Sequence, residues 1–518
     1  MESIWLDTTS DRTHDAFRSP PREGLSVDVA IIGGGIAGVT CAYLLKEAGL
    51  KVAVLESKRI ACGETGHTTA HITAIQDADF TTLRRKFGKD GARRIATAGM
   101  EAIDFIERLV RARQIDCDFE RMPAWIYSEH KRDVLFMKRQ VKAAREAGLD
   151  CEQVDMVPLP FDVAGGIRFE HQARFHPRNY VLALARAVDG DGSFVFEGAH
   201  VHAVEDGNPC RVNLADGTQV IANRVVSAAD AVVLNRFYMQ LKLAPMRTYA
   251  IGMRLDAELS GLFYDTDDPY HYIRTHPSAE GPILIVGGED HRVGEKSDTE
   301  ECYANLEAWT KARFGEGEVL YRWSGQVLEP LDGLPYIGRN PLSQNLFVAT
   351  GFSGNGMVNG TLAGMVLTDV MLGRENPYAR MLQARRMKPL ASAAAFVMNN
   401  QDFPRHMLTD RLPARHRHIA DVPPGEGRLV AEGGKKVAVF REEDGTVHRL
   451  SPVCSHMGCH VQWNGEAKSW DCPCHGSRFE AKTGEVLHGP ATHALAKVDE
   501  DEGRYEPVIG ADQPGQHG

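Results

Sequence analysis

Several features that define other protein classes are missing from this chain of 518 residues. It has no run of eighteen apolar residues, so we expect no transmembrane helix. The N-terminus has neither a basic start nor an apolar stretch, so we expect no secretory signal and favour the cytoplasm. The formal net charge of -11 argues against nucleic acid or an anionic membrane as a partner.

Cysteine is sparse along most of the chain. Six of the ten cysteines are scattered without the spacing of a disulfide framework, which is typical of reduced thiols in a reducing compartment. The other four lie in two short segments near the C-terminus, Cys454–Cys459 and Cys472–Ser477. This concentration indicates a metal site.

The two segments place cysteine and histidine at a distinctive spacing. Cys454 and His456 form C-x-H, and fifteen residues later Cys472 and His475 form C-x-x-H. Two thiolates on one iron and two imidazoles on the other are the ligands of a Rieske 2Fe-2S centre. Neutral imidazoles replace anionic thiolates there, so such a cluster accepts an electron more easily than an all-cysteine cluster. The pattern predicts a protein that handles single electrons.

A structural zinc site with two cysteines and two histidines is the alternative. It accounts for the same four ligands but leaves Cys459, Pro473, Cys474 and the pair Gly476–Ser477 without a purpose. A visible spectrum separates the two interpretations, because zinc is colourless.

The length of the chain predicts about three domains, and its composition of 43% hydrophobic and 25% charged residues is that of a globular protein. Residues 1–25 are polar and predict a loosely held N-terminal arm. Residues 373–424 are rich in Arg, His and Pro, and we interpret them as a linker. Residues 425–510 combine short strands with Gly turns, which predicts a small all-β module.

A β-α-β unit with a glycine-rich turn follows the arm. The buried strand 27–32 runs into G-x-G-x-x-G, and a second strand ends at Glu56. Gly33 allows the tight turn, Gly35 lets the backbone approach a pyrophosphate, and Gly38 lets the helix lie close to the sheet. The free amides of the helix N-terminus attract phosphate, and Glu56 is placed to accept hydrogen bonds from a ribose. This pattern predicts a dinucleotide site.

A second glycine-rich turn, Gly351–Gly356, follows the buried strand 346–350 and leads into an apolar helix. The runs Asp28–Glu56 and Gly325–Gly373 resemble the D-amino-acid oxidase-type flavoproteins, which include glycine oxidase and sarcosine oxidase. The resemblance spans roughly residues 25–375. It implies FAD, with the AMP half near the N-terminus and the flavin ring capped by the late helix start.

The resemblance also implies the fold class, α/β plus small all-β. We expect a Rossmann-like FAD-dependent oxidoreductase domain over 26–372 with an inserted α+β substrate domain, followed by a C-terminal Rieske β-sandwich module. The FAD-binding parts are expected at about 26–75, 170–235 and 320–372, and the substrate domain at about 76–169 and 236–319.

In this family a turn rich in Gly and Ser or Thr lies under the pyrophosphate and flavin, and Gly63–His71 is its counterpart here. His67 stands where dimethylglycine and sarcosine dehydrogenases carry a histidine bonded covalently to flavin, although Gly66 replaces the Trp that precedes it there. We expect His67 to line the flavin pocket, and acid precipitation tests covalent attachment. The residues expected to bind FAD are Gly33, Gly35, Ile36, Ala37, Gly38, Glu56, Ser57, Thr65, Gly66, His67, Thr68, Thr69, Gly351, Ser353, Gly354, Asn355, Gly356 and Met357.

The Rieske resemblance implies roles for individual residues near the C-terminus. Cys454 and Cys472 would bind one iron, and His456 and His475 the other. Cys459 and Cys474 would form a disulfide between the two loops, and Ser477 would donate a hydrogen bond to a cluster sulfur and raise the potential. Phe479 stands where respiratory Rieske proteins have Tyr, so we expect a lower potential than theirs. Gly489–Pro490 resembles the proline loop that covers the cluster.

A flavin accepts two electrons at once, whereas the cluster carries one. Their presence in one chain suggests that a two-electron oxidation is followed by one-electron transfers. The resemblance implies hydride transfer to FAD from the carbon next to nitrogen in an amine or amino acid, then transfer through the cluster to an external acceptor. A reductase that supplies electrons to a separate oxygenase or demethylase is one alternative, and a non-catalytic redox sensor is another. Candidate pocket residues are His176, Arg247 and His291; the oligomeric state is not predicted.

Overall fold

The computed structural model describes residues 2–9, 17–22, 24–229, 239, 242–255, 259–296, 299–386, 418–432 and 435–498. The chain divides into two compact units, which are described separately. Unit 1 comprises Met1–Asp230, Arg247–Asp290 and Tyr303–Ala391. Unit 2 comprises Ala231–Met246, His291–Cys302 and Ser392–Gly518.

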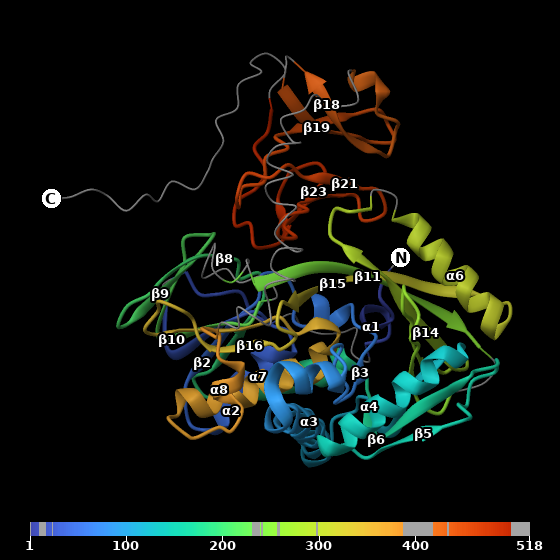
Figure 1. Ribbon diagram of the computed structural model, residues 1–518. Helices are drawn as coiled ribbons and strands as arrows, with labels where there is room; N and C mark the ends of the chain where they lie inside the picture. Colours follow the sequence, from blue (N-terminus) through green and yellow to red (C-terminus); the bar gives the residue numbers. More distant parts are fainter. Residues whose placement is uncertain are drawn as a thin grey trace. The chain divides into compact units, whose positions relative to one another are not determined.

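An eight-stranded sheet forms the centre of unit 1, with a parallel part in the order β17-β10-β1-β2-β7 (Figure 1). Its inner strands are almost continuously apolar, as expected of parallel strands that are covered on both faces. β16 and β9 pair antiparallel at its margins, and β8 pairs with β9. The strands are β1 (Leu25–Ile32), β2 (Val52–Leu55), β7 (Phe194–Phe196), β8 (Val201–Glu205), β9 (Cys210–Leu214), β10 (Gln219–Ser227), β16 (Tyr336–Arg339) and β17 (Leu346–Thr350).

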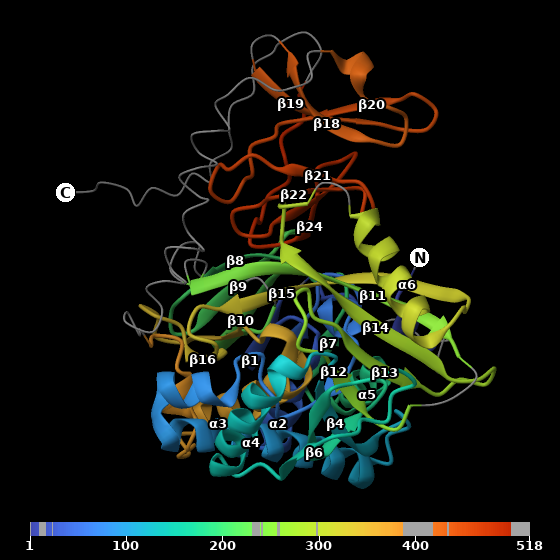
Figure 2. The ribbon, with the colours of Figure 1, turned by 45° about the vertical axis from the view of Figure 1, so that its right-hand side comes forward.

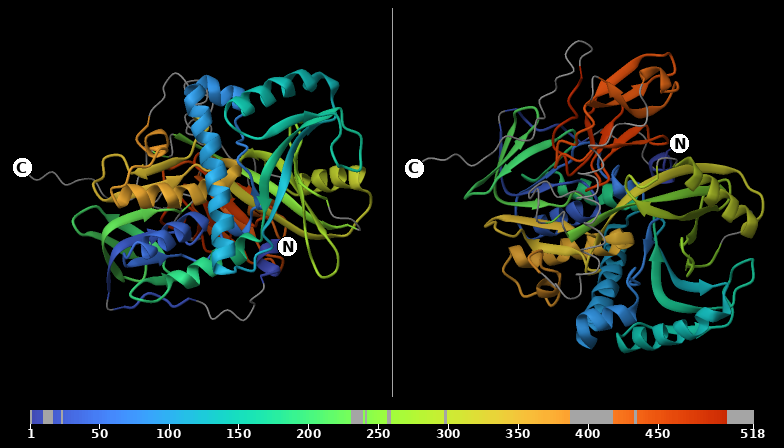
Figure 3. Two further views of the ribbon diagram at one scale, coloured as in Figure 1. Left: turned by 90° about the horizontal axis from the view of Figure 1, so that it is seen from below. Right: turned by 45° about the horizontal axis from the view of Figure 1, so that its top comes forward.

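Helices of unit 1 pack around this sheet. α2 (Ile36–Glu47) and α7 (Gly356–Met371) touch through glycine, since a Cβ on Gly360 would lie 2.8 Å from Cγ2 of Ile36. The long α3 (Phe80–Arg113), the blue helix of Figure 3, has a break at Gly88, where φ is +76°. The remaining helices are α1 (Ile4–Asp7), α4 (Val134–Glu146), α5 (Pro177–Val188), α6 (Glu300–Phe314) and α8 (Ala379–Leu382).

A second sheet has nine strands in the order β15-β11-β14-β13-β12-β4-β6-β3, with β5 paired to β6 (Figure 2). It is mixed, because β12 runs parallel to β4 while β13 and β14 are antiparallel. The sheet therefore fits the predicted α+β insertion. The strands are β3 (His71–Ile72), β4 (Glu120–Ser128), β5 (Cys151–Val154), β6 (Gly165–Arg174), β11 (Leu243–Arg254), β12 (Leu262–Tyr264), β13 (Tyr272–His276), β14 (Ile283–Arg292) and β15 (Val319–Pro330).

Unit 2 contains two small antiparallel sheets, coloured orange to red in Figure 1, which confirms the predicted all-β module. Their core includes Trp470, Phe479 and the two predicted cysteine ligands, all nearly inaccessible to solvent. One sheet comprises β18 (Gly427–Glu432), β19 (Lys435–Arg441) and β20 (Val447–Leu450), and the other β21 (Gln462–Asn464), β22 (Ser469–Asp471), β23 (Arg478–Glu480) and β24 (Val486–His488).

The start of the N-terminal arm differs from the expectation of a loosely held segment. Ile4 and Trp5 are completely buried, and the Ser3 side chain caps α1. Burial of the apolar side chains of Ile4 and Trp5 holds this segment on the protein, although the surrounding residues are polar. In the predicted linker, α8 and Arg386 belong to unit 1: the buried Arg386 forms an ion pair with Asp332. Residues 387–417 lie outside the described residues.

Candidate functional site

The first glycine turn follows β1. Gly33 has φ +107°, which is strained for any other residue. A Cβ on Gly38 would lie 2.1 Å from the carbonyl oxygen of Gly33, so the helix cannot approach the turn with a larger residue. The Ile36 amide donates to the Thr65 hydroxyl over 3.1 Å, which brings two predicted FAD-binding segments together. The turn is shaped to let a pyrophosphate approach the backbone.

Glu56 lies directly after β2, beside this turn. One carboxylate oxygen accepts from the Gly34 amide at 2.8 Å, and the other accepts from the Lys58 amide at 2.8 Å and the Ser57 hydroxyl at 3.2 Å. These contacts hold an acceptor at the carboxyl edge of the parallel strands, where a dinucleotide ribose is bound in folds of this kind.

The segment that contains η1 (Glu64–Gly66) is fixed to β15. The Glu64 carboxylate accepts from the Gln326 amide at 2.7 Å, and the Trp323 indole donates to the His67 carbonyl at 3.0 Å. His67 is half-buried, and its Nδ1 lies 2.9 Å from the Gly63 carbonyl oxygen. A Cβ on Gly66 would lie 2.4 Å from the Ala61 carbonyl oxygen, so a Trp at position 66 does not fit this backbone.

The second glycine turn forms η4 (Ser353–Asn355) and the start of α7. It follows β17, which lies parallel to β10 as β10 does to β1, so both glycine turns stand at the same edge of the sheet. The Gly354 amide donates to Asp77 at 2.8 Å, and the Asn359 side chain donates to the Phe352 carbonyl at 3.1 Å. Two helix starts and one carboxylate at a common edge fit a long dinucleotide such as FAD.

The three predicted pocket residues are held inside the protein. His176 is 1% exposed and accepts from the Asn179 amide at 3.2 Å, which caps α5. Arg247 is buried and donates to the Ser324 hydroxyl. His291 is also buried, with Nδ1 2.8 Å from the Arg292 carbonyl oxygen. His176 and Arg247 belong to unit 1, and His291 belongs to unit 2.

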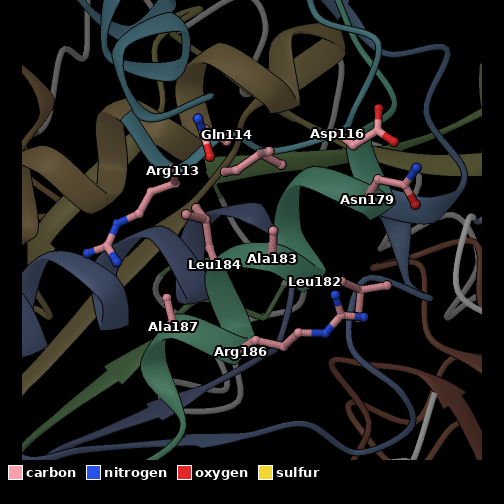
Figure 4. A pocket seen from close by; sticks show the side chains of 10 residues that line it. Arg113, Gln114, Asp116, Asn179, Leu182, Ala183, Leu184, Arg186 and Ala187 are labelled. Carbon is pink, nitrogen blue, oxygen red and sulfur yellow. The ribbon is translucent and has the colours of Figure 1, made fainter. Parts of the chain in front are cut away.

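A cavity of about 370 Å³ is lined by the end of α3, the residues that follow it, and α5 (Figure 4). None of the residues predicted to bind FAD lines it. Arg113 at its rim is bound to Tyr43 and Glu47, so this side chain is engaged in the fold. The lining residues are Arg113, Gln114, Ile115, Asp116, Asn179, Leu182, Ala183, Leu184, Arg186 and Ala187.

Two loops of unit 2 carry the predicted iron ligands. In the first, the Cys454 amide donates to the Cys459 carbonyl at 2.8 Å; in the second, the Cys472 amide donates to the Ser477 carbonyl at 2.7 Å. Gly458 and Gly476 have φ of +80° and +77°, which lets each loop turn back on itself. The two loops therefore share one backbone design.

The donor set converges between these loops. Cys454 and Cys472 are 2% and 1% exposed, and a hydrogen bond from the Cys472 thiol lowers the pKa of Cys454. The imidazole rings of His456 and His475 lie 5.0 Å apart, nearly perpendicular to each other. Two buried sulfurs and two neighbouring imidazoles are the ligands that a Rieske cluster requires.

A disulfide joins Cys459 to Cys474 and clamps the two loops, with 6.6 Å between the Cα atoms. The sulfurs of Cys459, Cys472 and Cys474 lie within 4.8 Å of one another. Two of these three sulfurs form the disulfide, so they are not free to bind metal as thiolates. Cys472 lies outside the disulfide, and its role as an iron ligand stays the prediction of the Rieske spacing.

Three residues to which the Rieske resemblance gives a role lie around the two loops. Ser477 is completely buried; its oxygen accepts from the Ala491 amide at 3.0 Å, and its hydrogen bond to Cys454 helps to lower the pKa of that thiol. Pro490 is buried beside this contact. Phe479 is completely buried and lies opposite Trp470 in the neighbouring strand.

Sequence reasoning missed a group of side chains beside the flavin segments, which comprises Asp77, Tyr264, Tyr270, Tyr272 and Asp290. The tyrosines come from β12, β13 and the turn between them, and Asp290 from β14. The only signal in the sequence is the spacing Y-H-Y at 270–272, which is common in ordinary strands.

Comparison with known families assigns a family to the N-terminal part and to the C-terminal part of the chain. The family described as FAD dependent oxidoreductase (DAO) matches residues 28–370, and the Rieske [2Fe-2S] domain family matches residues 414–499. A Rieske 2Fe-2S iron-sulfur protein of Bacillus subtilis, YhfW, is 30% identical over 96% of this chain and 98% of its own length. Gamma-glutamylputrescine oxidoreductase of Escherichia coli is 26% identical over 68% of this chain and 85% of its own length.

Solved structures show the same fold for the first part of the chain. Glycine oxidase from Geobacillus kaustophilus has a TM-score of 0.61 and 19% identity, and covers 70% of this chain and 100% of its own. L-proline dehydrogenase from P. horikoshii has a TM-score of 0.60 and 18% identity, and covers 70% of this chain and 98% of its own. The chain therefore belongs to the DAO family of FAD-dependent oxidoreductases, carries a C-terminal Rieske domain, and has FAD and a 2Fe-2S cluster as its cofactors.

Proposed function

We propose that the protein oxidises an amine or an amino-acid-like substrate and delivers the electrons one at a time to an external acceptor. The observation that carries this proposal is the presence, in one chain, of an FAD site and a Rieske ligand set. FAD held by the glycine turns would supply hydride acceptance, and a cluster held by the cysteine and histidine loops would supply one-electron transfer. The chain would then convert a two-electron oxidation into one-electron steps.

Relatives support the substrate class. Gamma-glutamylputrescine oxidoreductase, glycine oxidase and L-proline dehydrogenase are all named for amines or amino acids. The Bacillus subtilis relative matches this chain over nearly its full length, so the fusion of both halves is not peculiar to this chain. A neutral amine gives up its hydride directly, so no general base is required.

The residues of the chain bind the FAD and adjust the reduction potential of the cluster. The glycine turns and helix starts bind the diphosphate and hold the flavin, and Glu56 accepts hydrogen bonds from the ribose. Ser477 donates to the Cys454 sulfur, which favours the reduced cluster because the hydrogen bond stabilises the added negative charge. We assign the protein to the cytoplasm, in accord with the free cysteines along its first unit.

The test is anaerobic reduction of the purified holoprotein by a panel of amines, amino acids, NADH and NADPH, with flavin and cluster followed separately by absorbance. Bleaching by an amine or amino acid supports the proposal. Bleaching by NADH or NADPH alone would instead make the protein a reductase for a separate oxygenase or demethylase. No bleaching by any member of the panel would favour a redox sensor.

A further inference from the structure

Three tyrosines and two aspartates of unit 1 meet beside the flavin segments. Tyr264 ends β12, Tyr270 lies in the turn before β13, and Tyr272 begins β13. Asp290 lies on β14, and Asp77 follows β3. β12, β13 and β14 are neighbours in the mixed sheet (Figure 2). We call these five residues the tyrosine–aspartate cluster.

Direct contacts hold the cluster together. The rings of Tyr270 and Tyr272 lie 5.7 Å apart, and the Tyr272 hydroxyl is hydrogen-bonded to Thr248. Hydrogen bonds from Thr248 and Tyr270 reach the Asp290 carboxylate. A Cβ on Gly287 would lie 2.0 Å from the Tyr272 ring, so this glycine makes the space in which the ring lies. The positions of these side chains are therefore set by contacts between neighbouring strands.

The cluster is also attached to both segments that are expected to hold the flavin. The Gly354 amide of the late glycine turn donates to Asp77 at 2.8 Å. On the other side, the His71 ring lies 5.1 Å from the Tyr264 ring, and His71 Nδ1 lies 3.0 Å from the Thr69 hydroxyl. A substrate group bound by the cluster would therefore be close to the place that these segments form for the flavin.

The cluster presents accessible negative charge. Asp77 is an exposed residue and the three tyrosines are half-buried, so solvent reaches part of the cluster. Within the described residues, Oδ1 of Asp290 is fully buried and has no hydrogen-bond partner. A buried carboxylate oxygen without a donor is unfavourable unless a ligand supplies one.

Two arginines lie near the cluster, and the charge of Arg274 acts on Tyr264, where it lowers a pKa that burial raises. Arg247 precedes Thr248 on β11, and successive residues of a strand point to opposite faces, so Arg247 faces away and contacts Ser324. The Arg274 guanidinium is completely buried and donates to the carbonyl oxygens of Ala70 and Phe175. Both arginines are engaged in the fold, which leaves the cluster suited to a cation rather than to a carboxylate.

We propose that the cluster binds the ammonium group of an amine substrate that carries no carboxylate beside its nitrogen. Asp290 and Asp77 supply the negative charge, and the faces of Tyr270 and Tyr272 add cation–π attraction. This inference rests on the amine oxidation proposed above. Hydride transfer requires a neutral nitrogen at the reacting carbon, so in a diamine the cluster holds the other, protonated nitrogen.

Binding is tested separately from oxidation with two molecules of the same shape and opposite charge. tert-Butylammonium has no hydrogen on the carbon next to nitrogen and cannot be oxidised by hydride loss; pivalate replaces its ammonium with a carboxylate. We expect the FAD-loaded full chain to bind tert-butylammonium at least tenfold more tightly than pivalate in a titration of the flavin spectrum and in calorimetry. Equal affinity, or tighter binding of pivalate, would overturn the assignment.

Variants locate the binding in the cluster. Asp290→Asn should weaken the binding of tert-butylammonium at least tenfold while FAD content stays at the wild-type level. Glu280→Gln removes the same charge at an exposed position next to β14 and should change nothing. An Asp290→Asn protein with wild-type FAD content and unchanged affinity would contradict the proposal, and the wild-type comparison stands even where a variant does not fold.

Oxidation is then compared with 1,4-diaminobutane and ornithine, which differ only by a carboxylate. Faster anaerobic reduction of FAD by the diamine supports the inference, and faster reduction by ornithine would overturn it. Binding of tert-butylammonium without reduction by any amine would refute the proposed amine oxidation while leaving the ammonium site in place.

Discussion

The Trp5 indole donates a hydrogen bond to the carbonyl oxygen of Thr68. The N-terminal residues therefore hold the Gly63–His71 segment in place. The Ser3 hydroxyl makes the same kind of contact with Gly66. Trp5 also lies edge-on to His176 and His276, with ring centroids 5.0 and 4.9 Å away. The N-terminal residues are therefore part of the wall behind the Gly63–His71 segment.

Trp5→Ala should lower the free energy of unfolding of the FAD-bound protein by about 3–5 kcal/mol, because it removes a fully buried indole. The substitution should also weaken FAD binding, because the carbonyl oxygen of Thr68 loses its hydrogen-bond donor. Trp5→Phe keeps most of the packing and should cost about 1–3 kcal/mol for the unsatisfied carbonyl. Urea unfolding with FAD release measures both. Equal stability of wild type and Trp5→Ala would show that the segment stands without this support.

Gly38→Ala should abolish tight FAD binding, because the new Cβ would lie 2.1 Å from the Gly33 carbonyl oxygen and would push α2 away from the turn. Gly465→Ala in unit 2 is the matched control, since no atom lies closer than 3.6 Å to its Cβ position. FAD content per chain after gel filtration measures the effect. Full FAD content in Gly38→Ala would mean that the turn does not carry the diphosphate.

Phe479→Tyr should raise the reduction potential of the cluster. Phe479 is completely buried two residues after Ser477, and the tyrosine that the resemblance to respiratory Rieske proteins implies here would add a hydroxyl donor beside the cluster. One hydrogen bond of about 1 kcal/mol corresponds to about 40 mV for a single electron. Ser477→Ala should lower the potential by a similar amount. A redox titration that finds Phe479→Tyr at or below the wild-type value would contradict the role of this position.

Ammonium binding should weaken as the pH falls from 7.5 to 5. Burial raises the pKa of Asp290 to about 6, so the charge that attracts the cation is lost as pH falls through that value, while tert-butylammonium stays protonated. The titratable groups that act on Asp290 include Tyr270, Tyr272, Asp77 and His271. Calorimetric titration across this range should show a midpoint near 6 in the wild type and a flatter profile in Asp290→Asn. A flat wild-type profile would remove Asp290 from the site.

The recognisable parts of the protein are those where chemistry fixes residue types at short spacing. The glycine turn at Gly33 and the cluster loops at Cys454 and Cys472 need particular residues within six positions, so local sequence predicts them. The buried N-terminus escaped prediction, because whether Trp5 lies in solvent or against Thr68 depends on residues far along the chain. Asp290 and Tyr272 escaped for the same reason: sheet pairing, not local spacing, brings them together.

The central claim is that electrons pass from an amine through FAD to the cluster of the same chain. The most direct measurement is rapid-mixing absorbance and electron paramagnetic resonance of the anaerobic holoprotein after addition of 1,4-diaminobutane. The account predicts that flavin bleaching is followed by the signal of the reduced cluster, and that Cys472→Ser, which lacks a cluster ligand, bleaches the flavin without that signal. Complete flavin bleaching in the wild type with a cluster that stays oxidised would contradict the account.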